Sequence, residues 1–552
     1  MINDLWYKNA ILYCLSVGTY MDANGDGIGD FRGLLRRLDY LQGLGITAIW
    51  LMPFQPSPGR DDGYDVTDYY AVDPRYGTLG DFVEFTQGCR QRGVRVLIDL
   101  VVNHTSDEHP WFQRARKDPQ SKYRDWYVWS KKKPKDFRKG VVFPGFQKAT
   151  WNYDDVAKAW YFHRFYDFQP DLNTSNPEVQ LEILKIMGFW LQLGVSGFRM
   201  DAVPFVISRK GPGVRGLQEQ YDMLRVFREF LTWREGDAII LAEANVLPTV
   251  DMEYFGSAGE RLQMMFNFEV NQHLFYALAT SDSRPLIDSL EKTKSRPPTA
   301  QWGQFLRNHD ELDLGRLTKK QRQAVFTAFG PEPDMQLYDR GIRRRLAPMM
   351  EGDRRRLELA YSLLMSLPGT PVIRYGDEIG MGDDLHLPER NCARTPMQWS
   401  TEPHGGFTKS NKPVTPVISK GPYNFEHVNV AKQKRDPNSF MDWTERIIRM
   451  RKEIPEVGWG NFEVLATGAK EVLAIRYDWR NNSVVFVHNL SSIPQEVQFD
   501  IGVKDDGRLV NLLSEEHSAP DASKKHRVLL EPYGYRWYRV GGLDYLLKRT
   551  DI

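Results

Sequence analysis

Three acidic residues, each placed after an apolar run, carry the most chemical information in this chain. Asp201 ends the segment GFRMD, Glu243 lies within LAEAN, and Asp310 ends FLRNHD. Each apolar run stands between helical patterns, which is typical of the strands of a parallel α/β fold. In a (β/α)₈ barrel the C-terminal ends of the strands meet on one face, where catalytic groups lie. The three acids are therefore predicted to share one pocket, and a carboxylate group of this kind can cleave a glycosidic bond.

The elements that must position these acids alternate along most of the chain. Apolar patterns predict helices at residues 31–44, 79–92, 177–193 and 443–454. The strand candidates between them number eight, which predicts an α/β fold with a closed (β/α)₈ barrel rather than an open sheet. These candidates are residues 11–20, 46–52, 94–102, 195–203, 238–244, 263–268, 302–307 and 371–375.

Changes in pattern divide the chain into further units. The barrel is assigned to residues 1–102 and 175–457, and residues 103–174 are predicted to form an inserted small domain after strand 3 because a plain loop of that length is unusual. Residues 311–352 are charged and irregular, and are predicted to form an insertion after strand 7 on the catalytic face. From about residue 458, apolar and polar residues alternate with a period of two. Residues 458–552 are therefore predicted to form an antiparallel β-sandwich domain.

Composition narrows the possible partners. The 552 residues include 73 basic and 72 acidic side chains, a net charge of +1, which gives no reason to expect nucleic acid or a membrane as partner. The three cysteines lack metal-ligand spacing and favour a reducing compartment. Neither a signal peptide nor a membrane-spanning run is predicted. We expect a cytoplasmic protein that acts on a small sugar and uses no organic cofactor, with a homo-oligomer left open.

Several motifs in a fixed order resemble glycoside hydrolase family 13, the α-amylase family. The family's four segments match DLVVNH at residues 99–104, GFRMD at 197–201, EAN at 243–245 and NHD at 308–310. The sequence QPDLN at residues 169–173 resembles the marker of the oligo-1,6-glucosidase-like branch. RDDGYD, HPWF and ARTPMQW, which begin at Arg60, His109 and Ala393, are similar to the trehalose synthase group.

The resemblance implies a role for each acid. Asp201 would be the nucleophile, Glu243 the general acid/base, and Asp310 the group that stabilises the distorted sugar. A retaining glycosidase needs two carboxyl groups about 5–5.5 Å apart, one ionised and one protonated. Arg199 lies two residues before Asp201, hence on the same side of the strand, and is predicted to hold Asp201 ionised.

The resemblance also implies contacts with the sugar. His104 and His309 would bind hydroxyl groups, and Tyr64 would stack on the glucose ring. Asp61 with Arg394 resembles a pair that grips the 4-hydroxyl of a terminal glucose, although a plain structural ion pair is the alternative. Asn245 and Glu311 complete the substrate-binding set.

An acidic, glycine-containing loop is a separate candidate metal site. Oxygen ligands at every second position suit a hard cation, so the loop is predicted to hold structural Ca²⁺, or Mg²⁺, with a solvated acidic turn as the alternative. Its ligands would be the side chains of Asp22, Asn24, Asp26 and Asp30 and the carbonyl of Ile28.

Departures from the trehalose synthase pattern bear on a second cation and on the reaction. Asn103 and Asp171 would form a second cation site, but Ser208 stands where the group carries an acid. Gly315 replaces a further acid on the acceptor side, which is expected to favour hydrolysis. We therefore expect a retaining α-glucosidase with transfer activity on short α-glucosides such as maltose or trehalose. The alternatives are a trehalose synthase and, more remotely, a catalytically dead binding protein.

Overall fold

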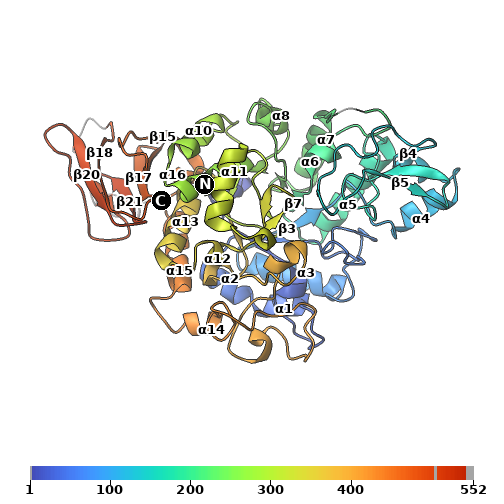
Figure 1. Cartoon of the computed structure of the whole chain (residues 1–552), viewed down its shortest axis with the longest axis horizontal. Helices are drawn as coiled ribbons and strands as arrows, with labels where there is room; N and C mark the ends of the chain where they lie inside the picture. Colours follow the sequence, from blue (N-terminus) through green and yellow to red (C-terminus); the bar gives the residue numbers. More distant parts are fainter. Residues whose placement is uncertain (1–2, 215, 503–506, 542–552) are drawn as a thin grey trace.

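A closed barrel of eight parallel strands forms the centre of the structure, a computed structural model that describes residues 3–214, 216–502 and 507–541 (Figure 1). The strands follow one another in the order β1-β14-β10-β9-β8-β7-β3-β2. All eight strand predictions are confirmed, and every strand except β14 is shorter than its predicted run. The strands are β1 Leu12–Leu15, β2 Ala48–Leu51, β3 Arg95–Leu100, β7 Gly197–Met200, β8 Ile239–Ala242, β9 Met264–Phe266, β10 Gln301–Phe305 and β14 Thr370–Arg374.

Helices alternate with these strands along the chain, and their ends follow local sequence signals. Thr78 and Asp81 form a capping box at the start of α3, and Gly45 ends α2 with φ 93°, a left-handed conformation that favours glycine. The single helix predicted over residues 31–44 is wrong in one respect: it is divided at Arg37 (φ −105°, ψ 5°). The helices are α1 Phe31–Arg36, α2 Leu38–Leu44, α3 Leu79–Gln91, α5 Pro177–Gln192, α6 Val203–Val206, α7 Asp222–Arg234, α8 Asp251–Phe255, α9 Phe268–Thr280, α10 Arg284–Lys292, α13 Arg354–Ser366, α14 Val430–Gln433, α15 Phe440–Lys452 and α16 Glu456–Trp459.

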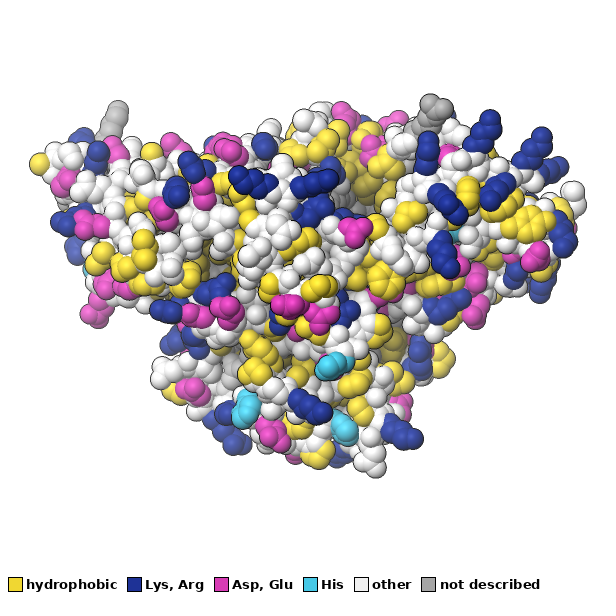
Figure 2. Space-filling view, viewed as in Figure 1, with side chains coloured by type: hydrophobic (Ala, Val, Ile, Leu, Met, Phe, Trp, Pro, Cys, Tyr) yellow, Lys and Arg dark blue, Asp and Glu magenta, His cyan; other side chains and the backbone are white. Residues whose placement is uncertain are grey.

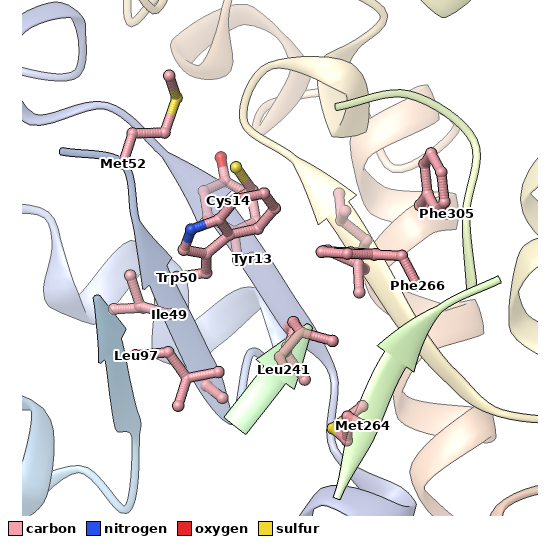
Figure 3. Packing of buried hydrophobic residues seen from close by; sticks show 14 of the residues in the cluster. Tyr13, Cys14, Ile49, Trp50, Met52, Leu97, Leu241, Met264, Phe266 and Phe305 are labelled. Carbon is pink, nitrogen blue, oxygen red and sulfur yellow. The ribbon is translucent and has the colours of Figure 1, made fainter. Parts of the chain in front are cut away.

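The barrel interior supports the predicted catalytic end. Figure 3 shows buried side chains from several barrel strands packed together, among them Trp50 of β2 and Phe266 of β9. The Trp50 ring lies 5.4 Å from the Phe266 ring and 5.6 Å from that of His309, and its Nε1 donates to Asp99 at 2.9 Å. An aromatic layer thus lies directly beneath the groups that follow the strand ends.

Two segments extend from the catalytic end of the barrel. Between β3 and β7 lie α4 Pro110–Lys117 and a small antiparallel sheet in the order β4-β6-β5, formed by β4 Trp129–Ser130, β6 Ala159–Phe162 and β5 Trp151–Asp154. After β10 the chain forms a second sheet in the order β11-β13-β12. This segment contains β11 Leu312–Asp313, α11 Lys319–Phe329, β12 Gln336–Leu337, β13 Gly341–Ile342 and α12 Leu346–Met349, so its prediction as irregular is wrong.

Two antiparallel sheets pack together in the C-terminal part of the chain, at the opposite end of the molecule from the inserted sheet (Figure 1). One cluster of buried side chains, including Val485 from one sheet and Phe499 from the other, lies between them, which confirms the predicted antiparallel β domain. The strands are β15 Asn461–Val464, β16 Val472–Trp479, β17 Asn482–Asn489, β19 Leu509–Asn511 and β21 Tyr535–Val540 in the first sheet, and β18 Gln495–Asp500 and β20 Lys525–Leu530 in the second.

The surface carries side chains of both charges. On the face shown in Figure 2, acidic and basic groups are interspersed, while Lys and Arg gather over the lobe that Figure 1 identifies as the inserted segment. In the described part of the chain, no helix has the length and apolar character needed to cross a membrane.

Candidate active site

The three predicted acids lie around one cavity of about 450 Å³ at the C-terminal ends of the barrel strands. Asp201 directly follows β7, Glu243 directly follows β8, and Asp310 lies in the loop after β10. All three line the cavity, as their positions after the strands predicted.

A single guanidinium connects two of these acids. Arg199 contacts Asp201 at 2.6 Å through Nη1 and Glu243 at 2.8 Å through Nη2, and Nη1 also contacts Asp99 at 2.6 Å. The Arg199 side chain is only 1% exposed. Because one planar group holds both Asp201 and Glu243, their carboxyls are kept close together, as a nucleophile and an acid/base must be.

Burial sets the protonation of this pair. Burial raises the pKa of Asp201 to about 6, although Arg199 acts in the opposite direction. Burial raises the pKa of Glu243 further, to about 7, and the charge of Asp201 adds to that rise. Arg199 lowers the Asp201 pKa, in the direction that favours the predicted ionised form, but desolvation outweighs the ion pair. Glu243 still holds its proton to a higher pH than Asp201, which is the order that the two roles require.

These pKa values predict a narrow pH optimum. Asp201 must be ionised to attack, so the rate should fall as the pH drops below about 6. Glu243 must hold a proton to donate, so the rate should also fall as the pH rises above about 7. A bell-shaped profile of kcat/KM with its maximum between these values is expected. A profile that stays flat to pH 9 would contradict the assignment of Glu243.

The residue after Asp201 has an uncommon backbone. Ala202 adopts φ 47° and ψ 41°, a left-handed conformation that costs a non-glycine residue about 1 kcal/mol. In this conformation the Ala202 N–H donates to Glu243 Oε2 at 3.2 Å. The turn thus contributes a second donor that orients Glu243 toward Asp201.

Asp310 has a different electrostatic environment. Burial alone would raise the pKa of Asp310, but the adjacent His309 and the guanidinium charges of Arg390 and Arg394 outweigh it and lower the pKa below its usual range. Arg390 and Arg394 contact Asp310 Oδ1 at 2.8 and 3.0 Å. Asp310 is therefore the member of the trio that stays ionised throughout the neutral range.

The predicted pairing of Asp61 with Arg394 is wrong. Asp61 is contacted by Arg390 at 2.7 Å, whereas Arg394 contacts Asp62 at 3.3 Å and Asp310. Arg390 lines the cavity between Asp61 and Asp310, and the sequence analysis did not select it. The sequence feature that could have indicated Arg390 as a site residue is its position four residues before Arg394.

The predicted sugar-binding side chains are grouped but make extensive contacts with one another. The rings of Tyr64 and His309 are stacked at 5.4 Å, and the Tyr64 hydroxyl lies 2.8 Å from His309 Nε2. His104 lines the cavity, with its Nε2 3.0 Å from the Tyr64 carbonyl. Burial lowers the pKa of both histidines, so both are neutral at pH 7.

Polar side chains also line the other end of the cavity. Asn245 donates to Asp313 at 2.9 Å and accepts from Arg316 at 3.1 Å, and Glu311 lies beside them with its pKa raised to about 7 by burial. Gly315 donates its N–H to Asp313, and an added Cβ would lie 2.9 Å from that carboxylate. Asp313 therefore places a carboxylate in the cavity wall beside Gly315, the position at which the acid of the trehalose synthase group is missing.

The loop of residues 22–30 is held by its own hydrogen bonds. Backbone N–H groups donate to Asp22 at 2.7 and 2.9 Å, to Asp26 at 2.8 Å and to Asp30 at 3.0 Å. Within residues 3–214, 216–502 and 507–541, no three His, Cys, Asp or Glu side chains converge as metal ligands. The acidic turn accounts for these contacts, and calcium binding through this loop, with Asn24 and Ile28, stays a prediction.

The second predicted cation position contains an ammonium group. Lys210 Nζ lies 2.7 Å from Asn103 Oδ1 and 2.9 Å from Asp171 Oδ2. Ser208 turns away and donates to the Pro204 carbonyl at 2.6 Å. The residues do not fit a metal ion here while Lys210 is in place, so this prediction is corrected.

Comparison with known proteins agrees with this geometry. The α-amylase catalytic domain model matches residues 17–328 and 342–460, and a sucrose hydrolase-like C-terminal domain model matches residues 482–539. A trehalose synthase of Thermus thermophilus is 42% identical over 99% of this chain, which spans 56% of that relative's length. A trehalose synthase of Pimelobacter sp. is 40% identical, covering 98% of this chain and 96% of its own.

Solved structures show the same architecture. The crystal structure of a trehalulose synthase superposes with a TM-score of 0.78 at 27% identity, covering 97% of this chain and all of that one. The residues matched by the catalytic domain model include the seven barrel strands from β2 to β14 and the three acids around the cavity. The chain therefore belongs to the α-amylase family, glycoside hydrolase family 13.

Proposed function

We propose that this protein interconverts maltose and trehalose by moving one glucosyl group within the active site, with hydrolysis as a side reaction. The single observation that carries this proposal is the cavity in which Asp201 and Glu243 share one guanidinium while polar side chains line the opposite end. The similarity of about 40% to two trehalose synthases favours transfer over the hydrolysis that the sequence analysis had preferred.

The first step would be the cleavage of the substrate. Asp201 attacks the anomeric carbon and forms a covalent β-glucosyl ester, while Glu243 gives its proton to the departing glycosidic oxygen. The bond to the leaving glucose breaks as the ester forms, so the charge on Asp201 is neutralised and Glu243 becomes ionised. Asp310, ionised and buried, stabilises the positive charge that develops on the sugar.

The second step would decide the product. Glu243 takes a proton from the 1-hydroxyl of the retained glucose, which attacks the ester and gives trehalose, whereas attack by water gives free glucose. The network of Asn245, Asp313 and Arg316 lies at the end of the cavity where that glucose must wait. A cavity of about 450 Å³ is within the range of small-ligand sites and suits a disaccharide.

Incubation of the purified protein with maltose tests the proposal. We expect trehalose to be the main product, with free glucose a minor one, when the sugars are separated by chromatography over time. Starting from trehalose should lead to the same final ratio of the two disaccharides, because transfer without water approaches an equilibrium.

A parallel preparation of Asp201→Asn serves as the control for contaminating enzymes, since it should form neither product. Glucose as the dominant product from the parent would overturn the proposal and favour the α-glucosidase instead.

A further inference from the structure

Lys210 lies at the junction between the barrel and the inserted segment, away from the reacting groups. It follows the turn after β7, and its side chain is only 3% exposed. Burial of an ammonium group is costly unless oxygen atoms replace its water. Its surroundings therefore show what this side chain does.

Four oxygen atoms surround the Lys210 ammonium. They are Asn103 Oδ1 at 2.7 Å, Asp171 Oδ2 at 2.9 Å, and the carbonyl oxygens of Asn103 and Leu172, each at 3.1 Å. An ammonium group has three N–H bonds, so it faces more acceptors than it can satisfy with one linear bond each. The four oxygens therefore surround a positive charge, and they are not paired one to one with the three N–H donors.

The chemistry of the four oxygens is that of a hard-cation site. One carboxylate, one amide oxygen and two backbone carbonyls are the ligand types that Ca²⁺ prefers. They come from two separate segments, since Asn103 follows β3 whereas Asp171 and Leu172 end the inserted segment. Asn103 and Asp171 are completely buried, so bulk water does not reach them.

The enclosed charge joins two parts of the molecule. The Leu172 N–H donates to the Asn103 carbonyl at 2.9 Å, and His104 and Asp171 form an antiparallel bridge beside it. His104 in turn lines the cavity. The four-oxygen cage thus holds the loop that carries His104 against the inserted segment.

We infer that the Lys210 side chain takes the place of a structural divalent cation at this junction, so that the barrel and the inserted segment are held together without a metal ion. This role is independent of which glucoside the enzyme uses. Lys210 acts as a positioning residue, because it reaches the cavity only through the loop that carries His104.

Removal of the ammonium should make the junction responsive to calcium. Lys210→Ala leaves the four oxygens without a cation, and we expect the melting temperature to fall by several degrees. Millimolar CaCl₂, compared with EDTA, should restore most of this loss in Lys210→Ala. The rise in melting temperature with calcium must be larger in Lys210→Ala than in the parent, because both proteins keep the separate candidate calcium loop of residues 22–30.

Two matched variants separate a metal site from general destabilisation. Asp171→Asn combined with Lys210→Ala keeps the shape of the cage but removes its carboxylate, so the calcium response should fall back to that of the parent. Lys210→Met keeps most of the volume without the charge, and should melt lower than the parent with no calcium response beyond the parent's.

The outcomes are decisive for the proposal. A Lys210→Ala protein whose melting temperature rises no more with calcium than the parent's would overturn it. If Lys210→Ala is not recovered folded, Lys210→Met decides instead, because a melting temperature equal to the parent's would show that the charge is dispensable. Neither result depends on catalytic activity, so failure here is distinct from failure of the proposed function.

Discussion

Asp201→Asn is expected to lower kcat on maltose by a factor of about 10⁴ or more. The amide that replaces the carboxylate is a far weaker nucleophile. Among the described acids that line the cavity, Asp201 is the one that directly follows β7, so no other acid can take its place there. Steady-state rates on maltose and on an aryl α-glucoside measure the loss. Both substrates should lose activity, because each requires the covalent ester.

Asp99→Asn provides a matched control for this variant. Asp99 contacts the same Arg199 guanidinium at the same distance of 2.6 Å as Asp201, and it too is buried. Asp99 does not line the cavity, so its replacement should cost far less activity than that of Asp201. Equal losses in the two variants would mean that Arg199 electrostatics, rather than nucleophilic attack, explain the effect.

Glu243→Gln is expected to separate the two halves of the reaction. The rate on maltose should fall by a factor of about 10²–10⁴, because the departing oxygen receives no proton. An aryl α-glucoside with a good leaving group should still form the ester on Asp201. Added azide, which needs no general base, should then speed turnover and yield an α-glucosyl azide.

Detection of that azide product by mass spectrometry checks the assignment. The parent provides the comparison, since Glu243 there activates the acceptor and azide should have little effect. A Glu243→Gln variant that keeps its full rate on maltose would remove Glu243 from the mechanism.

The barrel could be predicted because its strands are buried on both faces. Strands such as β2 and β8 are continuously apolar, which makes them recognisable in the sequence. The segment after β10 was harder, because β11, β12 and β13 have only two residues each and leave no periodic pattern. Its helix α11 was missed within a charged stretch.

The acids of the site could be predicted from strand ends and motifs, but their counter-ions could not. Arg390 lies in a short 3₁₀ helix, Glu389–Ala393, and Lys210 lies in a loop, and neither segment has a periodicity that indicates the direction of a side chain. Arg390 reaches Asp61 across 329 positions of sequence, and Lys210 reaches Asn103 across 107. Such pairings depend on how the loops fold over the barrel, which local sequence does not encode.

Arg390 ties together Asp61 and Asp310 in the wall of the cavity, and this has a thermodynamic consequence for any sugar that binds there. A hydroxyl that binds a carboxylate oxygen already contacted by Arg390 competes with a guanidinium N–H for that oxygen. The number of hydrogen bonds hardly changes in this exchange, so little net affinity is gained. A sugar without the matching hydroxyl leaves Asp61 and Asp310 paired with Arg390, so it loses little by lacking that group. Arg390 thus competes with each incoming sugar hydroxyl and weakens the discrimination between sugars at this wall of the cavity.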